Sequence, residues 1–206
     1  MIWGLLCYLM WGLFPAFFPL LQPATPMEIL AHRFVWTLVF MLLVLAAIRG
    51  FKQLRSITTR QWRIVAIAAL LISVNWGLYI YAVNNNHVAD AALGYFINPL
   101  VSVLLGVIVL GEKLRRLQVV SVGIATIAVV VLTVALGSPP VISLALAFSF
   151  GFYGLVKKQV SLTPIQSLTA ETLVLAPVGL IYLGFLQSQG TNTYVQLGAG
   201  HAALLM

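Results

Sequence analysis

Charged residues are scarce in this chain of 206 residues: Asp, Glu, Lys and Arg make up 7% of it, against about 25% in soluble proteins. Hydrophobic residues make up 62%, and the mean hydropathy is +1.06. No ordinary soluble globular domain has this composition. The sequence therefore predicts a protein that lives in a lipid bilayer.

Groups that carry catalysis or bind metals are also few. The chain has four acidic residues, three histidines and a single cysteine, Cys7. One cysteine cannot form a disulfide or a thiolate zinc site within one chain. A phosphate-binding loop, a His-Glu-x-x-His pattern and a Gly-x-Ser-x-Gly pattern are all missing. We therefore expect no enzyme activity, no ATP-driven pumping, no cofactor and no metal site.

Long stretches without charge recur along the chain. Residues 64–86 and 91–111 are uncharged, and each is as long as the roughly 20 residues that a helix needs to cross about 30 Å of hydrocarbon. Applying the same criterion throughout, we expect helices at residues 2–21, 26–48, 64–84, 91–110, 117–136, 141–157 and 164–186, with an eighth starting near 197. The predicted fold class is an all-α, polytopic membrane helix bundle.

Basic residues gather in alternate loops. Loops 49–63 and 111–116, with the sixth helix end at 157–158, hold ten of the eleven Lys and Arg residues, which include Arg55. Loops 22–25, 85–90, 137–140 and 187–196 hold none. This alternation predicts a multi-pass protein with a cytoplasmic amino terminus. The basic loops also account for the net charge of +7, so nucleic-acid binding is not needed to explain it.

Two similar helix starts indicate an internal repeat. Thr25-Pro26-Met27-Glu28 reads as a capping box, and Thr163-Pro164-Ile165-Gln166 repeats it 138 residues later. Trp11-Gly12 and Tyr153-Gly154 precede the two boxes, and we expect close helix approach at both glycines. The repeat unit has about five helices, an odd number, so the second copy should be inverted, as in many transporters.

The repeat sets the predicted domains. We expect a first repeat over residues 1–137 and an incomplete second repeat over residues 140–206. Two equal copies would need roughly 275 residues. We therefore expect about three further helices beyond Met206 in an intact protein.

Polar groups within the spans are candidate site residues, because each costs at least ~2.5 kcal/mol at a helix centre unless it is paired or wetted. Arg33 and Glu171 each lie eight residues after a capping threonine, about 12 Å along a helix. Both could bind a substrate in a central cavity, with Glu171 as the titrating carboxylate for proton or ion coupling. The alternatives are a structural ion pair and a snorkelling side chain.

Further candidates lie beside these two. His32 could relay protons or pack through a hydrogen bond, whereas Glu28 is explained by helix capping. Trp11 and Tyr153 occupy matching positions and either flank a cavity or pack. Asn75 and Tyr79 form one helical stripe, and Tyr95 and Asn98 another, where they either line a cavity or join helices. Pro99 interrupts the second helix, as a gate would require.

Four stretches resemble the EamA-type permeases of the drug/metabolite transporter superfamily, in particular the RarD-like group. They are Glu28–Arg33 with Trp36; Asn75-Trp76 with Ala82–Asn85, His87 and Leu93–Leu100; Leu110-Gly111-Glu112 with Gln118; and Ala147–Lys158. The run Gly94-Tyr95-Phe96-Ile97-Asn98-Pro99-Leu100 is the most specific of these.

The resemblance implies ten helices in two inverted five-helix repeats. It also implies a place in the bacterial inner membrane and secondary transport of a small organic metabolite or drug by alternating access. A non-transporting membrane scaffold or subunit is the alternative. The expected partners are a small-molecule substrate and the lipid bilayer, with no nucleic acid, and the oligomeric state is left open.

Overall fold

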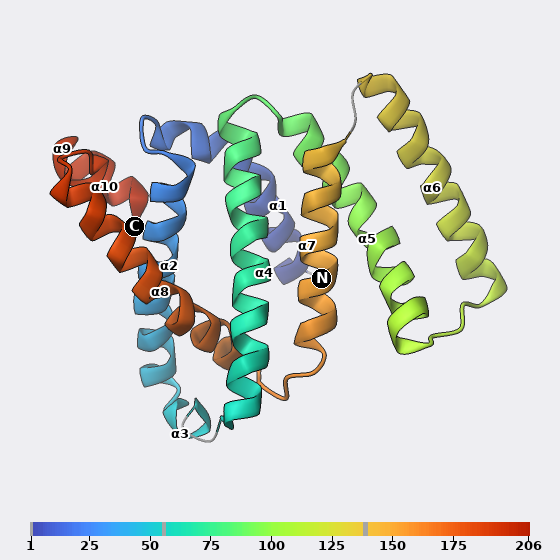
Figure 1. Ribbon diagram of the computed structural model, residues 1–206, viewed down its shortest axis with the longest axis horizontal. Helices are drawn as coiled ribbons and strands as arrows, with labels where there is room; N and C mark the ends of the chain where they lie inside the picture. Colours follow the sequence, from blue (N-terminus) through green and yellow to red (C-terminus); the bar gives the residue numbers. More distant parts are fainter. Residues whose placement is uncertain (1, 55–56, 138–139) are drawn as a thin grey trace.

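The computed structural model describes residues 2–54, 57–137 and 140–206 (Figure 1). Every regular element in these ranges is helical, which confirms the all-α bundle. The elements are α1 (Ile2–Phe17), η1 (Phe18–Leu21), α2 (Pro26–Ala47), α3 (Phe51–Leu54), α4 (Thr59–Asn84), α5 (Val88–Leu110), α6 (Arg116–Leu136), α7 (Val141–Lys157), α8 (Pro164–Ser188), α9 (Thr193–Gln196) and α10 (Gly198–Leu205).

The seven predicted spans each correspond to helical structure. Within the described ranges, six segments are long and apolar enough to cross a membrane, and α7 is shorter at 17 residues. The eight-residue α10 lies where an eighth helix was expected. Two short helices were not expected: α3 and α9 lie within predicted loops.

Local sequence signals explain where the helices begin and end. Thr163 and Gln166 form the expected capping box of α8. Thr58 and Gln61 form another, so α4 begins at Thr59, five residues before its predicted start. Gly111 ends α5 at a φ of 67°, in the left-handed region that glycine adopts without strain.

Lys and Arg residues gather at one end of the bundle, which we call the basic end. Figure 1 shows α3, the α5–α6 connection and the α7–α8 connection at the bottom of the view. The α2 start, the α4–α5 connection and the α8 end lie at the opposite, Lys/Arg-free end. The predicted alternation is therefore confirmed for the described helices, whereas Arg55 lies outside the described residues. That the basic end faces the cytoplasm stays a prediction.

Helix packing joins segments that are far apart in sequence. The most extensive contacts join α5 with α7, α2 with α8 and α4 with α7. A Cβ added at Gly94 of α5 would lie 3.0 Å from the Ser143 carbonyl oxygen of α7, and one at Gly179 of α8 would lie 3.0 Å from the Ala31 carbonyl oxygen of α2. These two glycines therefore permit the close approach of their helices.

The prediction that helices approach closely at Gly12 and Gly154 is wrong. A Cβ at either position would meet nothing within 4 Å in the described structure. Both glycines lie on helix surfaces that no neighbouring helix covers here. α6 is similarly uncovered: it packs against α5, and none of its spanning window is buried.

Candidate functional site

Arg33 of α2 lies among aromatic rings from three other elements. Its guanidinium carbon is 4.5 Å from the centre of the Trp76 ring in α4, 5.5 Å from that of Phe18 in η1 and 5.9 Å from that of Phe14 in α1. All three distances are within cation–π range. Arg33 lies about 12 Å along the helix from its cap Thr25, on the side of the Lys/Arg-free end.

Further rings extend this group across the bundle. The ring centroids of Phe18 and Tyr79 are 6.0 Å apart, those of Tyr79 and Tyr95 are 5.8 Å apart, and those of Tyr95 and Trp11 are 6.5 Å apart. We call these residues the Arg33 cluster: Trp11, Phe14, Phe18, Arg33, Trp76, Tyr79 and Tyr95. Four of them were predicted site residues, and Phe14, Phe18 and Trp76 were missed.

Arg33 has no acidic partner in the described chain. All four acidic residues are described, and each is engaged elsewhere: Asp90 with His87 at 2.9 Å, Glu112 with Lys158 at 3.3 Å, Glu171 with Lys157 at 2.7 Å and Glu28 with Thr193 at 2.7 Å. A charged arginine within a span costs at least about 2.5 kcal/mol. Each of the three cation–π contacts returns about 0.5–2 kcal/mol, so the rings stabilise the guanidinium but supply no counter-charge.

The Arg33 cluster is open on one side. The Trp11 side chain is 49% exposed and that of Tyr95 is 45% exposed, whereas Phe18 is buried at 2%. The hydroxyl groups of Tyr79 and Tyr95 make no hydrogen bond to any described residue. Pro99, one helical turn after Tyr95, has no N–H to donate to the Tyr95 carbonyl oxygen. The open side therefore combines ring surface with polar groups that have no partner in the described chain.

A second polar group lies toward the basic end. The Glu171 carboxylate of α8 is 1% exposed and accepts from Lys157 Nζ at 2.7 Å, Ser167 Oγ at 2.8 Å and Tyr153 Oη at 3.1 Å. Lys157 Nζ also donates to Tyr153 Oη. This is the geometry of an ion pair braced by two hydroxyl groups. Lys157 was missed because sequence reasoning treated it only as a charge at the sixth helix end that orients the protein in the membrane. Proton coupling through Glu171 stays a prediction.

Two amides from the predicted stripes have different surroundings. Asn75 is 4% exposed, and its Nδ2 donates to the Leu146 carbonyl oxygen at 2.9 Å and to Ser149 Oγ at 3.1 Å. The structure thus places Asn75 between α4 and α7, apart from the Arg33 cluster. Asn98 has a buried Oδ1 atom without a hydrogen-bond partner among the described residues.

His32 and Glu28 contact the last described helices. His32 stacks on Tyr194 with centroids 4.8 Å apart, and its Nε2 atom is buried without a partner in the described structure. Glu28, 1% exposed, accepts from both the backbone nitrogen and the Oγ1 of Thr193, at 2.7 and 2.9 Å. Thr193 Oγ1 also lies 3.3 Å from His201 Nε2. Glu28 therefore caps α9.

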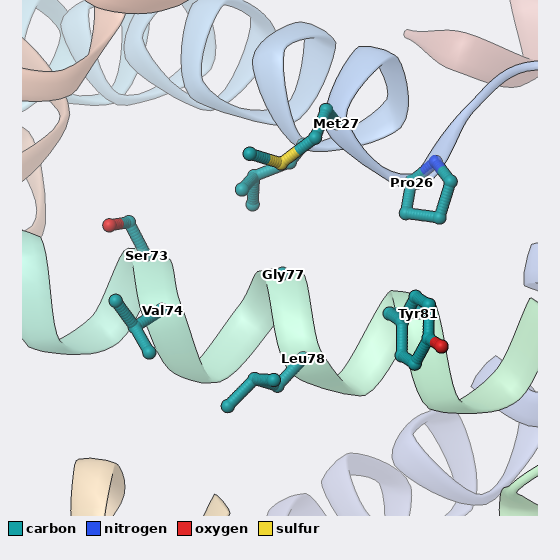
Figure 2. A pocket seen from close by; sticks show the side chains of 8 residues that line it. Pro26, Met27, Ser73, Val74, Gly77, Leu78 and Tyr81 are labelled. Atoms are coloured by element: carbon teal, nitrogen blue, oxygen red, sulfur yellow. The ribbon is translucent and has the colours of Figure 1, made fainter. Parts of the chain in front are cut away.

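A surface groove lies elsewhere, between α2 and α4 (Figure 2). It has a volume of about 440 Å³, and its lining residues are Pro26, Met27, Leu30, Ser73, Val74, Gly77, Leu78 and Tyr81. The Ser73 hydroxyl donates to the Leu70 carbonyl oxygen of its own helix at 2.8 Å. The groove thus offers a solute little polar recognition, and none of the Arg33 cluster lines it.

No group of three or more His, Cys, Asp or Glu side chains that could hold a metal ion occurs among the described residues. The Arg33 cluster is therefore the candidate site: a cation without a counter-ion, ring surface and two phenol groups, at span depth. This combination suits non-covalent binding of an organic solute. Its side chains include no nucleophile paired with a base.

Comparison with known proteins agrees with the resemblance drawn from the sequence. Residues 1–134 match the EamA-like transporter family. The chain is 52% identical to the protein RarD of Streptomyces exfoliatus, covering 100% of this chain and 66% of that protein. It is 47% identical to the uncharacterized transporter YojE of Bacillus subtilis, over 89% of this chain and 63% of YojE.

A third relative is the protein RarD of Escherichia coli K12, which is 42% identical over 92% of this chain and 64% of its own length. The chain thus spans about two thirds of the length of these relatives. No solved structure matches it. The family match covers more than half of the chain, and the identities extend across nearly all of it. The chain belongs to the EamA-like transporter family, in its RarD-like group.

Proposed function

We propose that this protein is a secondary transporter that moves a small organic metabolite or drug across the bacterial inner membrane by alternating access. The observation that carries the proposal is Arg33, a cation at span depth with no acidic partner in the described chain and with aromatic rings around it. A polar group in this setting is a solute-binding candidate because burying it unpaired is costly. Relatives in Bacillus subtilis and Vibrio cholerae that are named as uncharacterized transporters support the same function.

Alternating access requires a site that opens to each side in turn. We propose that residues 1–137 form one repeat and that residues 140–206 belong to a second, inverted one. Arg33 and Glu171 would then occupy equivalent depths measured from opposite faces. The Arg33 cluster would open toward the Lys/Arg-free end, and Pro99 would supply the flexible point in α5. The basic end would be cytoplasmic.

A flux assay tests the transport function. We expect the intact protein, including any helices that follow Met206, to move at least one radiolabelled solute across proteoliposomes down an imposed gradient, faster than the solute leaks across protein-free liposomes. The panel should contain carboxylates, amines and neutral compounds. Chloramphenicol belongs in it because a Pseudomonas aeruginosa relative, 28% identical, bears the name chloramphenicol-sensitive protein RarD.

The same assay separates transport from the rival functions. Absence of gradient-driven flux across the whole panel would contradict the proposal and favour a non-transporting scaffold or subunit. Chemical conversion of a solute in detergent, without any gradient, would instead indicate an enzyme. Repeating the flux with and without a pH gradient tests proton coupling.

A further inference from the structure

We infer that the Arg33 cluster binds a small aromatic monocarboxylate, with the carboxylate on the Arg33 guanidinium and the ring against Trp11 and Tyr95. The inference rests on the proposed transport function for its biological role. It names the chemical class of the solute, which neither the family nor the names of the relatives specify. It concerns binding, so it can be tested apart from flux.

Charge balance favours an anion. The chain has four acidic residues, and each contacts a partner other than Arg33. A solute carboxylate would supply the counter-charge that the described residues do not give to Arg33. A solute ammonium group would instead place a second cation beside Arg33 in a setting with low dielectric screening. A phosphate ester carries about −1.5 to −2 at pH 7, which one arginine does not neutralise, so a monoanion fits better.

The hydrogen-bonding groups favour the same class. Arginine presents five N–H donors in a planar fork that fits the two oxygens of a carboxylate. Within the described chain Arg33 makes no hydrogen bond, and the same holds for the Tyr79 and Tyr95 hydroxyl groups. The Tyr79 ring packs against Phe18, which contacts the Arg33 guanidinium, and the Tyr95 ring packs against Tyr79. A carboxylate could therefore accept from three side chains at once.

The rings determine what the rest of the solute should be. Trp11 and Tyr95 are the half-exposed members of the cluster, and their centroids are 6.5 Å apart. Phe14, Phe18 and Trp76 already face the guanidinium. Offset stacking on Trp11 or Tyr95 is open to a planar ring, whereas an alkyl chain gains no such contact. The expected ligand is thus a ring joined to one carboxylate by a short linker.

A binding experiment with matched probes tests this assignment. The same intact protein in phosphatidylcholine nanodiscs is titrated at pH 7 by calorimetry with phenylacetate, its neutral amide phenylacetamide, and phenethylamine, which is cationic. We expect phenylacetate to bind at least about tenfold more tightly than the amide, as charge-assisted hydrogen bonds imply. We expect no detectable binding of phenethylamine.

Variants locate the site. Arg33→Gln should weaken phenylacetate binding at least about tenfold and abolish the preference over the amide. Arg33→Lys, which keeps the charge, should retain the preference in part, and Tyr95→Phe should weaken phenylacetate but not the amide. Arg63→Gln is the control, because Arg63 is an exposed arginine near the basic end and its loss should change nothing. Circular dichroism of each variant checks that the helices remain folded.

Several results would overturn the inference: no binding of phenylacetate, equal binding of acid and amide, or a preference that survives in both Arg33 variants. Its failure is distinct from that of the transport function. Flux confined to neutral or cationic solutes would leave transport standing and remove the carboxylate site. Phenylacetate binding that depends on Arg33, without flux of any solute, would leave the site standing and remove the transport function.

Discussion

Replacing Lys157 with methionine is expected to lower the free energy of unfolding by about 2–3 kcal/mol, because it leaves the Glu171 carboxylate buried without its cation. The carboxylate is 1% exposed and lies 2.7 Å from Lys157 Nζ. The Lys157 side chain is itself 30% exposed. The loss should therefore fall below that of a fully buried pair, about 3–5 kcal/mol.

A double-mutant cycle isolates the pair. Unfolding in mixed micelles with increasing sodium dodecyl sulfate, followed by circular dichroism, gives the midpoint for Lys157→Met, Glu171→Gln and the double variant. The double variant should recover most of the lost stability, because a neutral amide can accept from Ser167 and Tyr153. Lys158→Met is the control, since Lys158 and Glu112 form an exposed pair. Equal midpoints for Lys157→Met and Lys158→Met would contradict the ion pair.

Replacing Glu28 with alanine is expected to release the last described helices. Two groups of Thr193, its backbone N–H and its hydroxyl, donate to the Glu28 Oε1 atom. Removal of that acceptor leaves the Thr193 N–H unsatisfied and leaves the hydroxyl only its longer contact with His201 Nε2, at a cost of about 1–3 kcal/mol. Limited proteolysis should then cut the chain within residues 189–206 much faster than in the wild type.

Two further substitutions interpret that result. Glu28→Gln keeps an oxygen acceptor in place, so its cleavage rate should lie between those of the wild type and the alanine variant. Glu112→Ala removes an exposed carboxylate at the opposite end of the bundle and should leave the rate unchanged. If Glu28→Ala is as resistant to protease as Glu112→Ala, the contact with Thr193 does not hold the segment.

The helices could be predicted from sequence because their signals are local. The absence of charge over span length, the threonine caps and the terminal glycines are all read within a few residues of each helix. Even here, the α4 start was placed too late, because Arg60 and Arg63 suggested a loop while the Thr58–Gln61 capping box went unrecognised. The predicted start of α4 followed the charged residues, whereas the observed start follows the capping box.

The contact partners of the polar and aromatic side chains could not be predicted in the same way. Glu28 lies in a first helical turn, so capping explained it locally, yet its carboxylate binds Thr193, 165 residues away. Lys157 was interpreted as an orienting charge at a helix end, yet its Nζ donates to Glu171 on another helix. Trp76, Phe14 and Phe18 were indistinguishable from the other aromatic residues until the fold placed them around Arg33. Side-chain partners depend on helix packing, which sequence spacing within one helix does not specify.

Thiol labelling tests most directly whether the Arg33 cluster is a water-reachable site within the membrane. In a Cys7→Ala background, which removes the single native cysteine, Tyr95→Cys and Phe96→Cys are compared with a sulfonated maleimide in membranes. Phe96 lies one residue further along α5, is 65% exposed and is not part of the Arg33 cluster, so we expect it to face lipid. The account predicts rapid modification of Tyr95→Cys and slow modification of Phe96→Cys. Equally slow modification of both would contradict it.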